Sequence, residues 1–127
     1  MEWIAIVTAL ALIEYSVFGA QTGRARVKYG VEAPATTGNE TFERHYRVQQ
    51  NTVEQLVTFL PALWLFALYA NAPIGAVVGL VFIVGRAVYA GAYLKDPSKR
   101  TVGFLMGFLA NAVLLLGGLG GALVAAL

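Results

Sequence analysis

The sequence contains no cysteine and only one histidine, His45. Without cysteine there is no disulfide framework, no thiolate metal site and no cysteine nucleophile, and one histidine alone does not form a zinc or haem site. Charged residues are also scarce: they make up 13% of the 127 residues, whereas 58% are hydrophobic. Soluble domains have about twice that charged fraction, and disordered chains combine low hydrophobicity with high net charge. The composition therefore excludes a disordered chain and argues against an ordinary soluble domain.

Four long apolar stretches occupy most of the chain. A membrane-spanning helix needs about 20 mostly apolar residues, and such stretches lie at about residues 3–22, 47–70, 73–94 and 101–127. We therefore predict a single domain over residues 1–127, an all-α integral membrane four-helix bundle. A secretory signal peptide would begin with basic residues. This chain begins with Met1-Glu2-Trp3, so we expect the first helix to be retained.

The basic residues predict how the helices are oriented. Eight of the nine lie in or beside the first and third connections between the apolar stretches: Arg24, Arg26, Lys28, Arg44, Arg47, Lys95, Lys99 and Arg100. Cytoplasmic loops of membrane proteins are enriched in Lys and Arg. We therefore expect these two connections in the cytoplasm and both termini outside. The excess of basic over acidic residues is then explained by the membrane topology, and we expect no nucleic-acid partner.

The ninth basic residue, Arg86, and the carboxylate Glu14 lie inside apolar stretches. A charge at bilayer depth costs about 2.5–3.5 kcal/mol or more, so such residues are functional candidates. Both lie about eight residues from the cytoplasmic ends of their helices, which is about 12 Å deep, and Glu54 reaches a similar depth. One interpretation is a structural ion pair between Arg86 and Glu14 or Glu54. The other is a functional polar layer between the helices.

The second and third stretches carry polar residues at helical spacing. Arg47, Asn51 and Glu54 share one face of a helix. Such a face suits a zwitterionic ligand, because Arg binds a carboxylate bidentately, Glu accepts from an ammonium group and Asn does either. Tyr89 and Tyr93 share a face with the intramembrane arginine; interfacial anchoring is the alternative role for tyrosines at a membrane boundary. The residues alone predict a polar pocket that faces the cytoplasm.

Glycines recur at four-residue spacing in the third and fourth stretches. This spacing lets helix backbones approach closely in lipid, although apolar helices rich in glycine also occur without a specific partner. The candidate pairs are Gly75 with Gly79, Gly103 with Gly107, and Gly117 with Gly121.

The stretch Phe42–Glu54, with the sequence FERHYRVQQNTVE, resembles the signature of the MAPEG family, the membrane-associated proteins of eicosanoid and glutathione metabolism. The resemblance extends through Phe59–Trp64 and Gly85–Leu94 and covers nearly the whole chain. The resemblance is strongest to the branch that contains leukotriene C synthase and lipoxygenase-activating protein, and it implies that this chain is a bacterial member of that branch. The resemblance implies a left-handed four-helix bundle in the bacterial inner membrane. It also implies a homotrimer that binds glutathione between neighbouring subunits.

The resemblance also implies roles for individual residues. Arg100 matches the arginine that activates the glutathione thiol, because a nearby guanidinium favours the thiolate, which is the nucleophile. The implied activity is a glutathione transferase, with glutathione peroxidase activity as an addition. Glutathione is the co-substrate, lipophilic molecules and membrane lipids are the other partners, and no metal is expected. The positions that hold glutathione in the family are matched here by Arg26, Arg47, Gln49, Asn51, Glu54, Tyr89 and Tyr93.

Two other functions stay open from the sequence. Non-catalytic relatives of the lipoxygenase-activating type share the fold but lack the second arginine and the final glutamate of the signature. This chain has both, as Arg47 and Glu54, which favours an enzyme over a lipid-binding scaffold. A small transporter is the third candidate, in which Glu14 would bind a proton or a cation.

Overall fold

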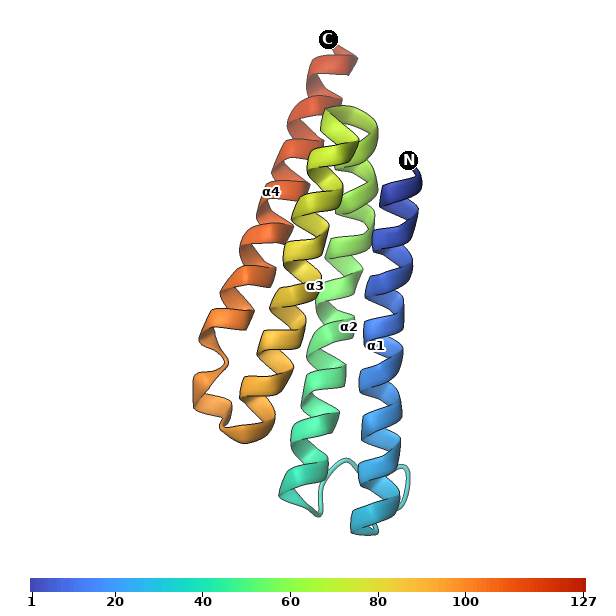
Figure 1. Cartoon of the computed structure of the whole chain (residues 1–127), viewed down its shortest axis with the longest axis vertical. Coiled ribbons are helices and arrows are strands. Elements are labelled where there is room, and N and C mark those ends of the chain that lie inside the picture. Colours follow the sequence, from blue (N-terminus) through green and yellow to red (C-terminus); the bar gives the residue numbers. More distant parts are fainter.

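The computed structural model describes all 127 residues, and its regular structure is entirely helical. A π-helical segment, η1 (Ala67–Asn71), joins the second α-helix to the third, and a short 3-10 helix, η2 (Pro97–Lys99), precedes the fourth. The predicted all-α fold class is confirmed. The four α-helices are α1 (Glu2–Tyr29), α2 (Glu40–Phe66), α3 (Ala72–Lys95) and α4 (Thr101–Ala126) (Figure 1).

Local capping determines where the helices begin and end. At the start of α2, the Asn39 side chain accepts a hydrogen bond of 3.0 Å from the backbone N–H of Phe42. Asn71 makes the equivalent bond at the start of α3, and Gly30, at φ 67°, ends α1 in the left-handed conformation that glycine adopts without strain. As a result, α2 begins at Glu40, ahead of the predicted apolar span. The polar segment before that span is also helical, because the Asn39 side chain caps the backbone N–H groups at its start.

Three helical stretches are long and apolar enough to cross a membrane, and the middle one contains both α2 and α3. The chain reverses direction within that stretch, so α2 and α3 run antiparallel (Figure 1). At the reversal, Asn71 has an extended backbone, with φ −159° and ψ 115°. The α1–α2 and α3–α4 connections lie at one end of the bundle, whereas the α2–α3 turn and both termini lie at the other (Figure 1). The three stretches are Glu2–Tyr29, Glu40–Lys95 and Pro97–Ala126.

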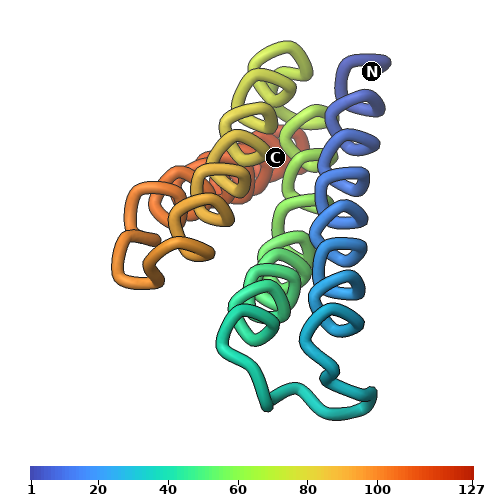
Figure 2. Tube along the Cα trace, turned by 60° about the horizontal axis from the view of Figure 1, so that its bottom comes forward, coloured from blue at the N-terminus to red at the C-terminus, as the bar shows by residue number.

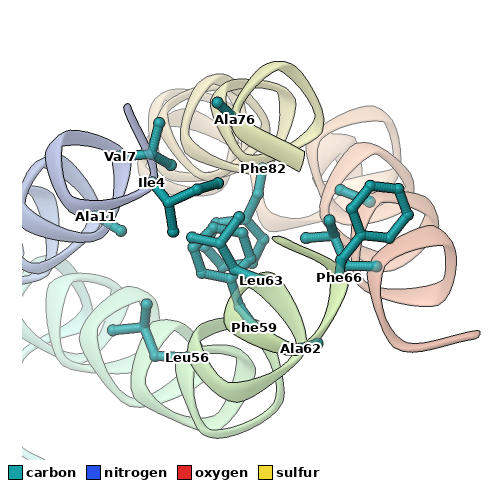
Figure 3. Packing of buried hydrophobic residues seen from close by; sticks show 12 residues of the cluster. Ile4, Val7, Ala11, Leu56, Phe59, Ala62, Leu63, Phe66, Ala76 and Phe82 are labelled. Atoms are coloured by element: carbon teal, nitrogen blue, oxygen red, sulfur yellow. The ribbon is translucent and has the colours of Figure 1, made fainter. Parts of the chain in front are cut away.

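The buried core draws side chains from all four α-helices. At its centre the rings of Phe59 and Phe82 stack with their centroids 3.9 Å apart, and Leu63 and Val7 pack around them (Figure 3). Many other large apolar side chains point outward; Leu116, for example, is 66% exposed. An exposed apolar surface of this extent is unfavourable in water and is suited to the hydrocarbon of a membrane.

The predicted glycine pairs lie at helix contacts within the chain. A Cβ atom at Gly103 would collide with the backbone of Tyr89, and one at Gly121 would collide with the backbone of Tyr69. Gly107 also faces α3 but has more room, because a Cβ atom there would make an ordinary contact of 3.8 Å with Phe82. The missing side chains therefore allow close approach of neighbouring helices and bring Tyr89 beside the start of α4.

The helices separate into two pairs at the end that carries the α1–α2 and α3–α4 connections. There, the end of α3 and the start of α4 diverge from the end of α1 and the start of α2 (Figure 2). The candidate site lies at this end of the bundle.

Candidate functional site

A cavity of about 260 Å³ lies between α2, α3 and α4. α2 and α3 each contribute two side chains that are one turn apart, because residues four positions apart lie on the same face of a helix. The other two come from the residue just before α4 and from α4 itself. The structure thus brings together five of the residues predicted for the site, and Phe104 adds an apolar wall. The lining residues are Arg47, Asn51, Tyr89, Tyr93, Arg100 and Phe104.

The turn between α3 and α4 places Arg100 at the cavity. Asp96 organises this turn, since its Oδ1 atom accepts hydrogen bonds from the Ser98 hydroxyl (2.8 Å) and the Ser98 backbone N–H (3.0 Å). These two bonds lower the pKa of the Asp96 carboxyl below its ordinary value. Arg100 Nη1 donates to the Pro97 carbonyl at 2.8 Å. The guanidinium is therefore attached to the turn that precedes α4.

Arg86 packs against Tyr89, one of the two tyrosines that form the α3 side of the cavity. The rings of Tyr89 and Tyr93 stack with centroids 5.5 Å apart, and the Arg86 Cζ atom lies 4.2 Å from the Tyr89 ring centroid. Arg86 is only 1% exposed. Its Nη2 atom donates to the Thr52 hydroxyl at 2.9 Å, and that hydroxyl donates to the Val48 carbonyl at 2.7 Å. This chain of contacts joins α2 and α3 directly under the cavity.

The structure contains no ion pair between Arg86 and either Glu14 or Glu54. Its two ion pairs are Met1 with Glu2 and Glu40 with Arg44. The ion pair with Glu14, one of the two interpretations of the sequence, is therefore not formed within the chain, and Arg86 donates to Thr52. Glu14 Oε1 and Arg86 Nε are buried without a hydrogen-bond partner.

The cavity is electropositive. Arg47 and Arg100 both line it, and neither takes part in an ion pair. Asn51 Oδ1 is buried there without a partner, so one acceptor is also available. Two guanidinium groups and an amide can bind a carboxylate and stabilise a second anionic group. The chain has no cluster of three or more His, Asp or Glu side chains that could hold a metal ion.

Three residues predicted for the site do not line this cavity. Arg26 donates to the carbonyl groups of Val31 (3.2 Å) and Ala35 (2.8 Å) and so braces the α1–α2 connection. Gln49 packs toward α1, where a Cβ atom at Gly19 would lie 3.4 Å from its Nε2 atom. Glu54 is exposed on α2.

Sequence reasoning missed two residues that the structure places at or under the site. Phe104 lines the cavity one turn after Arg100, so helical spacing along α4 could have identified it. Thr52, which binds Arg86, carries no comparable signal. A threonine in an apolar helix commonly bonds to its own backbone, and the sequence does not show which helix faces it.

Comparisons with known proteins agree with this description. The MAPEG family model matches residues 4–120. The uncharacterized protein sll1147 of Synechocystis sp. is 53% identical over 117 residues, which are 92% of this chain and 85% of that protein. Microsomal glutathione S-transferase 2 of Homo sapiens is 42% identical over 92% of this chain and 80% of its own length. Leukotriene C4 synthase of Cavia porcellus is 36% identical over 76% of this chain and 65% of its own length.

Proposed function

Because this chain belongs to the MAPEG family and is an integral membrane protein, we propose that it is a membrane-bound glutathione transferase with additional glutathione peroxidase activity. The single observation that carries the proposal is the cavity in which Arg47, Asn51, Tyr89 and Arg100 meet. Relatives named microsomal glutathione S-transferase 2 and leukotriene C4 synthase support it. Glutathione is the co-substrate, and the second substrate is a lipophilic electrophile from the bilayer.

Glutathione carries two carboxylates, one ammonium group and one thiol, and the cavity itself offers cationic partners for one carboxylate and for the thiol. Arg47 pairs with a carboxylate through two parallel hydrogen bonds. Glu54, which lies outside the cavity on the exposed face of α2, accepts from the ammonium group of a glutathione molecule that extends beyond the cavity, and Asn51 adds a polar contact inside it. Tyr89 and Tyr93 close the side of the cavity formed by α3. This arrangement leaves Arg100 for the thiol.

Arg100 supplies the chemistry. Its guanidinium favours the thiolate form of glutathione, because an opposite charge within about 4–6 Å lowers the pKa of an acid. The thiol proton leaves to water, and the sulfur attacks the electrophile, so that a C–S bond forms as the bond to the leaving group breaks. In the peroxidase reaction, two glutathione thiols reduce a lipid hydroperoxide to an alcohol and water, and they become a disulfide.

Completion of the site requires neighbouring copies of the chain. Arg26 and Gln49 match glutathione-binding positions of the family but do not line the cavity. We propose a homotrimer in which one subunit contributes Arg47, Asn51 and Arg100, and its neighbour contributes Arg26 and Gln49. Four spans in the bacterial inner membrane, with the α1–α2 and α3–α4 connections in the cytoplasm, place this site where cytoplasmic glutathione meets membrane lipids.

The test is ultraviolet thiolate absorbance on addition of glutathione to the purified protein in lipid nanodiscs. We expect a glutathione-dependent signal in the native protein and about ten-fold less thiolate, or lower still, in Arg100→Ala. Lys99→Ala is the matched control, because it removes a neighbouring cation that does not line the cavity. The signal should persist in that variant.

Absence of a glutathione-dependent signal in the native protein would remove the proposal. Conjugation of an aryl halide provides the second readout. A protein that binds fatty acids but shows neither the thiolate nor conjugation would instead be a lipid-binding scaffold.

A further inference from the structure

A second cavity, of about 400 Å³, lies between α2 and α4. We call it the α2–α4 groove. Phe108 and Leu116, which line it, are 53% and 66% exposed, so the groove opens toward the surroundings of the bundle. No charged residue lines it. Its walls are formed by Gln55, Thr58, Phe108, Asn111, Ala112, Leu115 and Leu116.

Two amide side chains lie in this apolar groove. Asn111 is only 7% exposed, and its Nδ2 atom donates to Gln55 Oε1 at 3.3 Å. Asn111 Oδ1 is buried and has no hydrogen-bond partner. Gln55 Nε2 makes no hydrogen bond within the chain. If both terminal amide groups are flipped, so that their oxygen and nitrogen atoms exchange places, the pair still presents one free acceptor and one free donor.

A buried acceptor without a partner is costly, and this one lies on the wall of a cavity that could hold a ligand. A hydroxyl group matches the amide pair, because it donates to one amide and accepts from the other. A carboxylate has no proton to donate and would be desolvated in the groove without a cation. The apolar remainder of the groove suits a hydrocarbon chain. The expected ligand is therefore a lipid with an oxygen substituent along its chain.

The α2–α4 groove follows directly on the site that contains Arg100. Along α2, Gln55 lies one turn after Asn51, and along α4, Phe108 lies one turn after Phe104. The rings of Phe104 and Phe108 stack with centroids 6.3 Å apart. One face of each helix thus passes from the polar cavity into the groove.

We propose that the Gln55–Asn111 amide pair is a specificity site that recognises a hydroxyl or hydroperoxyl group on a lipid chain lying in the α2–α4 groove. The proposal rests on the proposed function in one respect: the lipid held there is the reaction partner of the glutathione thiolate. Binding of the lipid itself depends only on the groove and the amide pair.

The experiment measures binding of oleic acid and ricinoleic acid, which differ by one mid-chain hydroxyl group, as competitors of labelled ricinoleic acid in phosphatidylcholine nanodiscs. We expect the native protein to prefer ricinoleic acid roughly 3- to 10-fold, the value of one net hydrogen bond. Asn111→Leu, which removes the acceptor at similar volume, should abolish the preference. Gln55→Leu is the second variant and should reduce it. Thr58→Val, in the same groove, should retain it.

Equal affinity for both acids in the native protein would overturn the proposal, and so would a preference that survives in Asn111→Leu and Gln55→Leu. Failure of both acids to bind would show that the groove is covered, as by a neighbouring subunit, and would also overturn it. The thiolate signal is measured in the same samples. A hydroxyl preference without that signal would reject the transferase while supporting the lipid site, and the reverse result would reject the lipid site alone.

Discussion

At the scale of single residues, Arg86 shows what a sequence conveys about a charge in a membrane. Its place in an apolar stretch predicted a buried charge, and the structure buries it to 1% exposure. Its partner was not predictable, because an ion pair with Glu14 depends on how α1 is rotated relative to α3. In the structure, Arg86 bonds instead to Thr52 and stacks under Tyr89.

We therefore expect Thr52→Val to lower the free energy of unfolding by about 1–3 kcal/mol, because a buried donor of Arg86 loses its partner. Denaturation in mixed detergent micelles, followed by circular dichroism, measures this difference. Thr58→Val is the control, because Thr58 is exposed and makes no hydrogen bond; its effect should stay within about 0.5 kcal/mol. Equal stability of the two variants would contradict the supporting role of Thr52.

The sequence predicted those parts of the candidate site in which helical spacing alone determines which side chains lie together. Arg47 and Asn51 were expected on one face of a helix and line the same cavity, and so do Tyr89 and Tyr93. Arg100 was identified only through the resemblance to the family, since spacing alone made it an ordinary cytoplasmic cation. The proposed contribution of Arg26 and Gln49 from a neighbouring subunit also exceeds what spacing provides, because contacts between copies leave no periodic pattern in one chain.

At the scale of elements, the packing of α3 against α4 positions both tyrosines relative to Arg100. A Cβ atom at Gly103 would collide with the backbone of Tyr89, whereas Gly107, one turn later, has room for one. Both glycines belong to the same predicted pair, so the sequence suggested a close contact. It did not show which of the two makes it.

Gly103→Ala should destabilise the protein by about 1–3 kcal/mol, because overpacking forces the backbones of α3 and α4 apart. Gly107→Ala should be neutral or slightly stabilising, since alanine is the better helix former by roughly 0.5–1 kcal/mol. Thermal unfolding in detergent compares the two variants, and glutathione affinity should fall only in Gly103→Ala. A stable Gly103→Ala variant with native affinity would show that this contact does not position the site.

The turn between α3 and α4 has a pH dependence of its own. The lowered pKa of Asp96 means that its hydrogen bonds stabilise the turn above the ordinary pKa of aspartate. That contribution is lost as the pH falls through the lowered native value. We expect Ser98→Ala to raise the pKa of Asp96 toward its ordinary value, and Ser98→Thr, which keeps the hydroxyl group, to leave it low. Carbon-13 NMR titration of the carboxyl group measures both, and an unchanged pKa in Ser98→Ala would contradict this description of the turn.

At the scale of the whole molecule, the order and type of the elements followed from the sequence, whereas their arrangement in space did not. The four apolar stretches predicted the helices, and the basic residues in the connections between them predicted which connections share a side of the membrane. At the cavity end α3 and α4 diverge from α1 and α2 (Figure 2), and they stay close to each other through contacts such as that of Gly103 with Tyr89. These contacts arise only after the helices have packed.

The central claim is that the cavity of this chain binds glutathione with its thiol next to Arg100. The most direct measurement is a cryo-electron microscopy structure of the protein in nanodiscs with glutathione. We expect density for a tripeptide beside Arg47, with its sulfur next to the Arg100 guanidinium and Arg26 of an adjacent chain in contact with it. Two results would contradict this expectation. One is a cavity without tripeptide density at saturating glutathione, and the other is a structure in which Arg47 and Arg100 point into separate regions.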